Sequence, residues 1–403
     1  MKKLLLTFSV FCLLCLPGSP WAMGETPHQY QAGFRPVGIS SLGSHGGDHN
    51  LGQSVDHNID HNIELVSSVA VWYPSARKGR ARYTVRVGEW FFEAERNAKP
   101  AAGRFPVILL SHDMAGHNLA NHDLALALAR HGFVVIAPTH YGDNFDNASA
   151  IFSAALYYHR PRQLLAALRK IRELEELRAI MDISRLGVLG SGSGAITALQ
   201  LAGADLDPAA APAFCESNPA DPVFCNPWAL SRQLKLPAEA ADIKTKFGPD
   251  AFRPSLALPA EAAAPRPEAV GLLAPGGLFM LDKKSLAALP APLGAVFAAE
   301  DEFFPVPATD DSQAGNRNTS NWGGLVPPGL AFRPLMRICA GVDHYSLAAP
   351  CPENMANTLP GMCGSAGEDE RAEAAAERDD FFIAFFRLHL GLPGEIEAPE
   401  AAP

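Results

Sequence analysis

Residues 185–199 constrain the fold more than any other part of this sequence. A short apolar run at 186–189 leads into a cluster of very small residues at 190–195, and an apolar, helix-forming segment follows at once. A strand that turns sharply into a helix brings backbone segments so close that only Gly, Ala or Ser fit around the turn. The pattern therefore predicts a nucleophile elbow, which presents one side chain at the tip of the turn.

The register of this elbow leaves two alternatives open. In the pattern Gly-x-Ser-x-Gly the nucleophile stands two residues after the first glycine. Counted from Gly190, with Gly194 as the closing glycine, that position holds Gly192, which has no side chain that could react. If the elbow is shifted by one residue, Ser193 stands at the tip between small residues. In the first register the site has no side chain at the tip that could form a covalent intermediate. In the second register Ser193 is a serine nucleophile displaced by one residue.

The composition and the N-terminal residues limit the classes of protein to which this chain can belong. The chain has 403 residues, of which 48% are hydrophobic and 19% charged, enough for one large α/β domain with insertions. A net charge of −10 disfavours nucleic acid as a partner. Two lysines followed by the apolar run 4–16 predict a signal peptide over residues 1–24. We therefore expect a periplasmic or secreted protein with no stable membrane span after cleavage.

Five cysteines remain once the predicted signal is removed. Two pairs of cysteines lie in segments rich in Pro, Asn and Gly, where a disulfide could close a loop in an oxidising compartment. They are Cys215 with Cys225, and Cys351 with Cys363. Cys339 lies in an apolar run and is interpreted as a buried free thiol. The sequence does not fix this connectivity.

The polar segment 25–64 contains the tripeptide Asp-His-Asn three times. Its imidazole and carboxylate groups are of the kind that bind divalent ions. A solvated loop is the preferred interpretation, and we expect neither a metal nor a cofactor. The histidines concerned are His45, His49, His57 and His61.

Buried strands alternate with helices over residues 65–393, which predicts one α/β domain with a mostly parallel central sheet and helices on both faces. Strands are expected at 65–73, 82–92 (beside the first), 105–111, 133–138, 186–189, 269–273, 293–299 and 335–340, and helices at 119–131, 160–179 and 371–390. Residues 204–265 are expected to form a lid-like insertion after the elbow helix, and residues 307–329 a second insertion. The tail 394–403 is expected to be disordered.

Three strand ends carry reactive groups in the order elbow, acid, histidine. Because parallel strands end at one edge of a sheet, these groups are expected to meet there. His344 would act as general base, and Asp301 would orient and stabilise its imidazolium. Glu300 and Glu302 are alternatives for the acid.

An oxyanion hole is expected from two backbone N–H groups, that of Met114 and that of the residue after the nucleophile, which is Gly194 in the Ser193 register. Asp113 stands beside this place. Unless its carboxylate points away, the negative charge works against binding of an oxyanion.

Several motifs resemble those of one superfamily. They are Val-Trp-Tyr-Pro at 71–74, Leu-Leu-Ser-His at 109–112, Leu-Ala-Arg-His-Gly-Phe at 128–133, Arg-Pro-Arg at 160–162, the elbow, Ala-Pro-Gly-Gly at 274–277, and His-Tyr-Ser-Leu at 344–347. The chain resembles the α/β-hydrolase superfamily, and more narrowly its exported dienelactone-hydrolase-like and platelet-activating-factor-acetylhydrolase-like members. The resemblance implies the α/β-hydrolase fold and esterase or lipase-like hydrolysis by a Ser-Asp-His triad. Such relatives usually have serine where Gly192 stands and glycine where Asp113 stands.

Three functions are compatible with these observations. The first is an ester hydrolase of small or lipid-like molecules that uses Ser193. The second is a catalytically inactive hydrolase-fold protein, a pseudoenzyme, that binds a ligand or partner in the former active-site pocket. In the third, His344 and Asp301 activate water directly, without a covalent intermediate.

Overall fold

The structure is a computed structural model that describes residues 29–38, 66–85, 88–253, 266–303 and 335–392. Its main sheet has the strand order β11-β10-β9-β8-β6-β7-β2-β1-β5. The strands are β1 (Gln31–Gly38), β2 (Val66–Ser75), β5 (Glu95–Arg96), β6 (Phe105–Ser111), β7 (Val134–His140), β8 (Met181–Ser191), β9 (Ala269–Leu273), β10 (Leu293–Ala298) and β11 (Leu335–Cys339). Neighbours from β7 to β11 pair in parallel, whereas β2 pairs antiparallel with both β7 and β1.

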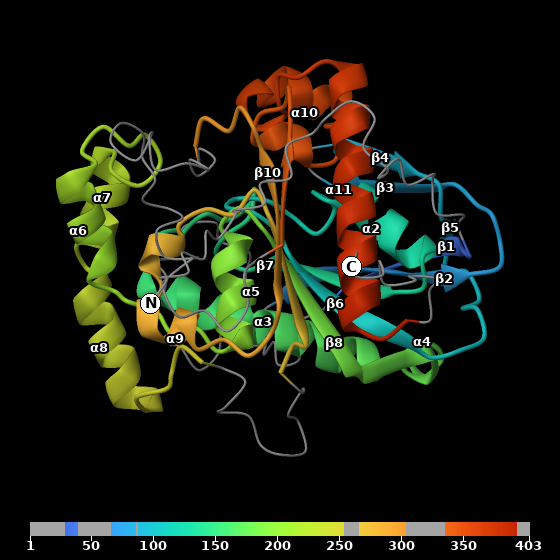
Figure 1. Ribbon diagram of the computed structural model, residues 1–403, viewed down its shortest axis with the longest axis horizontal. Coiled ribbons are helices and arrows are strands. Elements are labelled where there is room, and N and C mark those ends of the chain that lie inside the picture. Colours follow the sequence, from blue (N-terminus) through green and yellow to red (C-terminus); the bar gives the residue numbers. More distant parts are fainter. Residues whose placement is uncertain (1–28, 39–65, 86–87, 254–265, 304–334, 393–403) are drawn as a thin grey trace, which may run out of the picture.

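Helices cover both faces of this sheet (Figure 1). α2 (His122–Arg130) and α11 (Glu368–His389) pack on one face, and α3 (Ala154–Arg172) and α5 (Gly194–Ala202) on the other. Strands β6, β7, β9 and β10 are buried along their whole length, and β8 is buried from Leu186 onward, since both faces are covered. The predicted α/β-hydrolase fold is confirmed.

Three predicted elements need correction. β1 lies within the segment 25–64 expected to be a loop, and it extends the main sheet by pairing with β2. Residues 82–92 do not join that sheet, but form β3 (Ala81–Val85) and β4 (Gly88–Phe92), a separate hairpin. The helix expected at 160–179 starts earlier, because Ser153 caps α3 by accepting from the Leu156 N–H, and it is interrupted before α4 (Glu175–Ile180).

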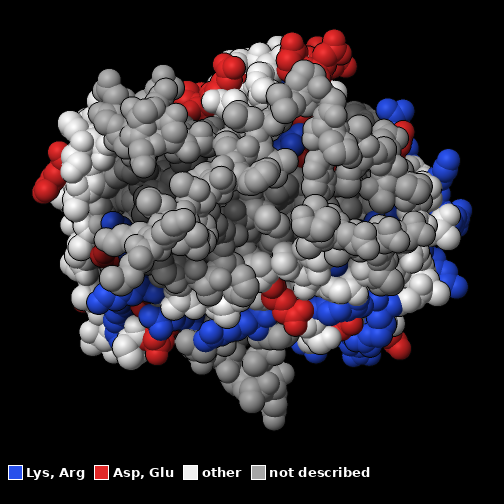
Figure 2. Space-filling view, viewed as in Figure 1, with Lys and Arg blue, Asp and Glu red and all other residues white. Residues whose placement is uncertain are grey.

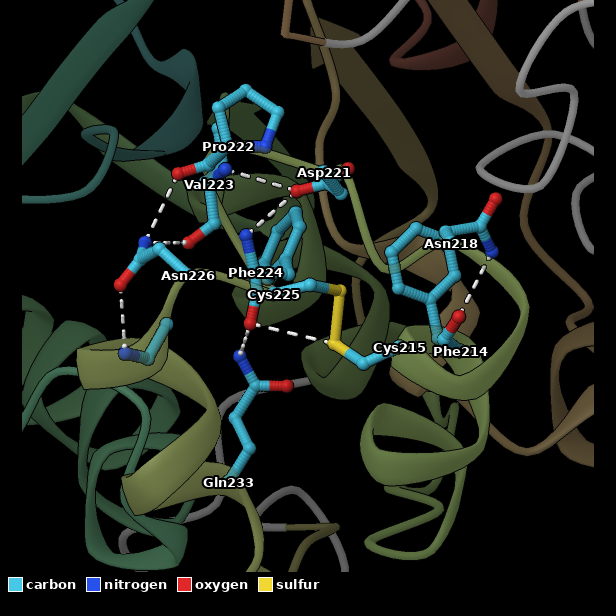
Figure 3. Close-up of a disulfide and its surroundings, with 11 residues drawn as sticks. Phe214, Cys215, Asn218, Asp221, Pro222, Val223, Phe224, Cys225, Asn226 and Gln233 are labelled. Carbon is cyan, nitrogen blue, oxygen red and sulfur yellow. Dashed lines mark hydrogen bonds between the residues drawn. A yellow bond between two sulfur atoms is a disulfide. The ribbon is translucent and has the colours of Figure 1, made fainter.

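The insertion after α5 is helical where it is described. It holds α6 (Ala210–Ser217), α7 (Pro227–Gln233) and α8 (Leu236–Phe247), which lie at the outer left of Figure 1. The Cys215–Cys225 disulfide joins α6 to the loop before α7, where the Asp221 carboxylate accepts from two backbone N–H groups (Figure 3). A lid role for this insertion stays a prediction.

The cysteine predictions are confirmed. A second disulfide joins Cys351 and Cys363, on either side of α10 (Glu353–Thr358), and Cys339 is a buried free thiol.

The short helix α9 (Lys283–Ala287) lies between β9 and β10. Within the described ranges, no helix is long and apolar enough to cross a membrane. The predicted signal, the four histidines, the insertion 307–329 and the tail lie outside the described residues.

Helix α11 begins with an acidic turn and ends against the sheet. Glu368, Asp369 and Glu370 form its first turn, and Figure 2 shows acidic side chains gathered at this end of the molecule. Negative charge at a helix N-terminus complements the helix dipole. Further along, the ring of Phe386 lies over Gly187 and Gly271, where an added Cβ would stand about 3.0 Å from its atoms. The strands thus lack side chains where the helix needs room.

Replacing Phe386 by alanine is expected to lower the free energy of unfolding by about 3–5 kcal/mol, because a fully buried aromatic ring is lost and a cavity is left. Denaturant unfolding would show a lower midpoint with an unchanged slope. Phe91→Ala is the matched control, since that ring is 54% exposed and its loss should change the midpoint little. Equal effects of both changes would contradict this account of the core.

Candidate active site

The elbow between β8 and α5 adopts the register with Gly192 at the tip. Gly192 has a positive φ of 52°, a conformation that favours glycine. A Cβ at Gly190 would stand 2.2 Å from the carbonyl oxygen of Gly194, and one at Gly194 would stand 2.3 Å from that of Ser111. These two glycines therefore permit the close approaches that the turn needs, with Gly192 midway between them.

The side chain missing from Gly192 is replaced by a carboxylate from another loop. A Cβ built on Gly192 would stand only 1.9 Å from Oδ1 and 2.0 Å from Cγ of Asp113. Asp113 follows β6 by two residues, at the same edge of the sheet as the elbow. The carboxylate thus occupies the place of a nucleophilic side chain, and it does not point away from the site.

Two backbone N–H groups bind one oxygen of this carboxylate. Oδ1 of Asp113 accepts from the N–H of Met114 at 2.6 Å and from that of Ser193 at 2.7 Å. Met114 was expected in this place. The second donor is Ser193 and not Gly194, because the elbow takes the Gly192 register and the residue after the tip supplies the N–H. The predicted oxyanion hole therefore contains a negative charge of the protein itself.

The other oxygen of Asp113 contacts the histidine. Oδ2 of Asp113 lies 2.9 Å from Nε2 of His344, and Oδ2 of Asp301 lies 2.8 Å from Nδ1 of the same ring. Asp301 follows β10 and His344 follows β11, so the ends of parallel strands bring them together. The alternatives Glu300 and Glu302 are exposed.

These contacts set the protonation of the ring. Burial alone would lower the pKa of His344, but hydrogen bonds and charges of Asp113 and Asp301 outweigh it and raise that pKa to about 10. Burial also opposes ionisation of Asp113, yet His344 and the two N–H donors lower the pKa of its carboxyl. At neutral pH an imidazolium therefore lies between the two carboxyl groups. In this state it has no free position to accept a proton.

The hydroxyl of Ser193 is held by a different partner. It accepts a hydrogen bond from Nη1 of Arg160 at 3.1 Å. Nη1 also donates to Oδ2 of Asp143 at 2.6 Å, and both of these side chains are almost fully buried. The structure therefore brings Asp301 and His344 together, as predicted, but it turns the Ser193 hydroxyl toward Arg160.

Arg160 and Asp143 form a support beneath the site that the sequence reading missed. Nη2 of Arg160 donates to the carbonyl oxygen of His112 and to Oγ of Ser111, and Oδ1 of Asp143 accepts from the N–H of Ala115. The pair thus fixes both sides of the loop that carries Asp113. Asp143 stands just after the end of β7, the kind of position that identified Asp301.

Two buried histidines extend this support. Nε2 of His112 accepts from the backbone N–H of His140, whose own Nε2 lies 3.0 Å from Oγ of Ser111. Burial, followed by the charge of Arg160, holds the pKa of His112 and of His140 well below its usual range. Both rings are therefore neutral and serve as hydrogen-bonding parts of the scaffold. In the described part of the chain, no group of three or more His, Cys, Asp or Glu residues is suited to hold a metal ion.

Part of the chain is similar to a known protein family. The model of the dienelactone hydrolase family matches residues 93–226, a range that holds Asp113, Arg160 and the elbow. No curated protein matches the chain. Among solved structures, it is similar to a ferulic acid esterase from Streptomyces cinnamoneus, with 15% identity, a TM-score of 0.49, and coverage of 93% of this chain and 94% of that one. The similarity to the dienelactone hydrolase family covers about a third of the chain.

The Gly192 register makes a prediction about two coupled substitutions. Gly192→Ser alone is expected to lower stability without creating an active serine, because the new Cβ would overlap the Asp113 carboxylate. Gly192→Ser combined with Asp113→Gly frees that space and both N–H donors. The double variant should be labelled by a fluorophosphonate probe and should hydrolyse 4-nitrophenyl butyrate at least about 100-fold faster than the single variant. Equal labelling of a folded single variant would refute the overlap.

The raised pKa of His344 makes a second prediction. A group whose pKa is raised in the folded state stabilises that state fully below its unfolded pKa of about 6.5, and this stabilisation is lost as pH rises through about 10. The stability advantage of the wild type over His344→Asn should therefore shrink between pH 7 and pH 10. NMR of the ring nitrogens should show His344 protonated at pH 8, and Asp113→Asn should lower its pKa. A neutral His344 ring at pH 7 would contradict the ion-pair assignment.

Proposed function

We propose that the protein hydrolyses small-molecule esters and that the carboxylate of Asp113 takes the place of the missing serine, in a centre completed by His344 and Asp301. The family match supports the hydrolase class. The observation that carries the proposal is the position of Asp113, which contacts Nε2 of His344 with one oxygen and both N–H donors with the other.

The carboxylate fits the role of a nucleophile. Carboxylates form covalent intermediates in several enzyme classes, and a nucleophile is expected within hydrogen-bond reach of a base that a third group orients. Asp113, His344 and Asp301 form such a series, with successive distances of 2.9 and 2.8 Å. The side chain of Asp113 is 18% exposed, whereas those of His344 and Asp301 are 4% and 2% exposed. Asp113 is therefore the member that a small molecule can reach.

The absence of a side chain at Gly192 is part of the same arrangement. Any larger residue there would occupy the space of the Asp113 carboxylate. Glycine at the elbow and aspartate at the loop after β6 are thus complementary. In the proposed centre the nucleophile stands after β6 and not after the neighbouring β8, while His344 and Asp301 serve as base and acid.

Ser193 is less suited to the role, because its hydroxyl is bonded to Arg160 and its N–H is one of the two donors. Direct activation of water by His344 and Asp301 is disfavoured as well, since the imidazole is already protonated at neutral pH. In the proposed centre, His344 becomes a base only after Asp113 has reacted.

A second candidate function is ligand binding without catalysis. The observation that favours it is that the reactive groups of the centre are already bonded to one another. Asp113 fills the predicted oxyanion hole and pairs with the His344 imidazolium. Such a protein would bind its ligand beside Asp113 and release it unchanged.

We also propose that the protein is exported, to the periplasm or outside the cell. Two disulfides in the described residues support an oxidising compartment. The basic start and apolar run at residues 1–16 support a signal peptide.

The proposed centre is tested by acid release in a pH-stat from three esters: 4-nitrobenzyl acetate, β-butyrolactone and 4-nitrophenyl butyrate. Asp113→Asn and His344→Asn should each lower kcat on a hydrolysed ester at least about 100-fold, because the nucleophile or its base is lost. Glu175→Gln, an exposed carboxyl on α4, is the matched control and should leave kcat unchanged.

Other results would overturn this proposal. Unchanged turnover by Asp113→Asn would exclude Asp113 as the reacting group. Loss of activity in Ser193→Ala, with labelling of the wild type by a fluorophosphonate probe, would establish the displaced serine instead. A folded wild type that hydrolyses none of the three esters would favour the ligand-binding function.

A further inference from the structure

We propose that Asp113 attacks the saturated alcohol carbon of its ester substrate, so that the alkyl–oxygen bond breaks and not the acyl–oxygen bond. This inference rests on the function proposed above and names its substrate class. The substrates are esters whose alcohol carbon is unhindered and activated, such as benzylic esters and strained lactones.

The occupied oxyanion hole argues against attack at an acyl carbon. Attack on a carbonyl group creates a negative oxygen on the substrate, which needs preorganised donors such as backbone N–H groups. In this site the N–H groups of Met114 and Ser193 already bind Oδ1 of Asp113. Attack at a saturated carbon creates no such oxygen, because the charge leaves with the carboxylate product. The geometry is therefore suited to alkyl transfer.

The first step forms an ester on the protein. Oδ2 of Asp113 bonds to the alcohol carbon, the bond between that carbon and the ester oxygen breaks, and the substrate's carboxylate leaves with the electron pair. The departing carboxylate takes the proton from Nε2 of His344, which leaves the ring neutral. Asp113 changes from a carboxylate to an alkyl ester. No oxidant, reductant or metal is required.

The second step uses the donors and the histidine. Water loses a proton to His344 and adds to Cγ of Asp113, and the resulting negative oxygen lies where Met114 and Ser193 already donate. Collapse of this intermediate releases the alkoxide, which takes the proton from His344, and restores the carboxyl group of Asp113, whose proton then passes to His344. Water and ester are thus converted to acid and alcohol, with a water oxygen left on Asp113 at each turnover.

The two steps are coupled by charge. Asp113 holds His344 in its protonated form in the resting site, so the ring cannot act as a base before the substrate arrives. Alkylation neutralises Asp113 and removes one of the two acidic partners of the ring. With its proton passed to the departing carboxylate, His344 is the base of the second step, and Asp301 still holds its Nδ1.

A small apolar cleft lies beside the centre. Met114 and Ser193 lie at one side of this narrow cleft, whose wall is largely apolar. Phe152, Leu156 and Phe224 line this wall, and all three are buried. The cleft encloses about 10 Å³, which is room for about one water molecule, so the alkyl group of a substrate does not fit within it.

Isotope labelling tests which bond breaks. Wild-type protein is allowed to hydrolyse 4-nitrobenzyl acetate in ¹⁸O-water over many turnovers, and both products are examined by mass spectrometry. Attack by Asp113 at the benzylic carbon places the heavy oxygen in 4-nitrobenzyl alcohol, through the carboxyl group of Asp113, and leaves acetate unlabelled. The peptide that contains Asp113 should also gain heavy oxygen.

A trapped intermediate provides the second measurement. In His344→Asn the ester on Asp113 should accumulate, because the base for its hydrolysis is missing, and the Asp113 peptide should carry a 4-nitrobenzyl group that hydroxylamine removes. Asp113→Asn should carry none. The peptide that contains the exposed Glu175 controls for non-specific alkylation and should stay unmodified.

The outcomes separate this inference from the proposed function. Heavy oxygen in acetate, with hydrolysis that still depends on Asp113, would overturn alkyl transfer and leave the Asp113 centre standing. Turnover of 4-nitrophenyl butyrate alone would do the same, because that ester has no saturated alcohol carbon. Hydrolysis that does not depend on Asp113 would overturn both.

Discussion

The contact between Asp113 and His344 is the interaction on which the chemistry of this site depends. One carboxylate oxygen lies 2.9 Å from the ring, and the other accepts the two N–H bonds at the elbow. The contact keeps the ring protonated and fills the oxyanion hole with the protein's own charge. Such a centre cannot work as a serine triad in this state. Its parts suit a nucleophilic carboxylate that activates its base only after reacting.

The scaffold around this contact explains how a charge can be held there. Arg160 and Asp143 form a buried ion pair, and Arg160 also binds the carbonyl oxygen of His112 and the hydroxyl of Ser193. The loop that carries Asp113 is thereby tied to the elbow and to α3. Burying an ion pair costs desolvation energy, which hydrogen bonds to the remaining atoms offset. The ion pair of Arg160 and Asp143 therefore fixes the geometry of the loop that carries Asp113 more than it adds to the stability of the fold.

Particular residues show how far the sequence could predict this site. Asp301 and His344 were found because reactive side chains directly after buried strands converge at one sheet edge. Asp143 obeys the same rule but was passed over, since it falls outside the order of a serine triad. The choice between Gly192 and Ser193 at the tip of the elbow stayed open, because a one-residue shift cannot be judged without backbone angles. β1 was missed because its partner β2 lies 28 residues away, beyond a polar segment that obscures the pattern.

The sequence by itself determined the alternation of buried strands and helices, the small residues of the elbow, the cysteines available for two loop disulfides, and the acid and histidine at their strand ends. These follow from local patterns: burial on two faces, close backbone approach, and the position of a residue relative to its strand. The tertiary structure alone decided what lies at the empty Cβ position of Gly192. Asp113 and Gly192 lie 79 positions apart in the sequence. Only the parallel pairing of β6 with β8 brings the carboxylate of one to the empty Cβ position of the other.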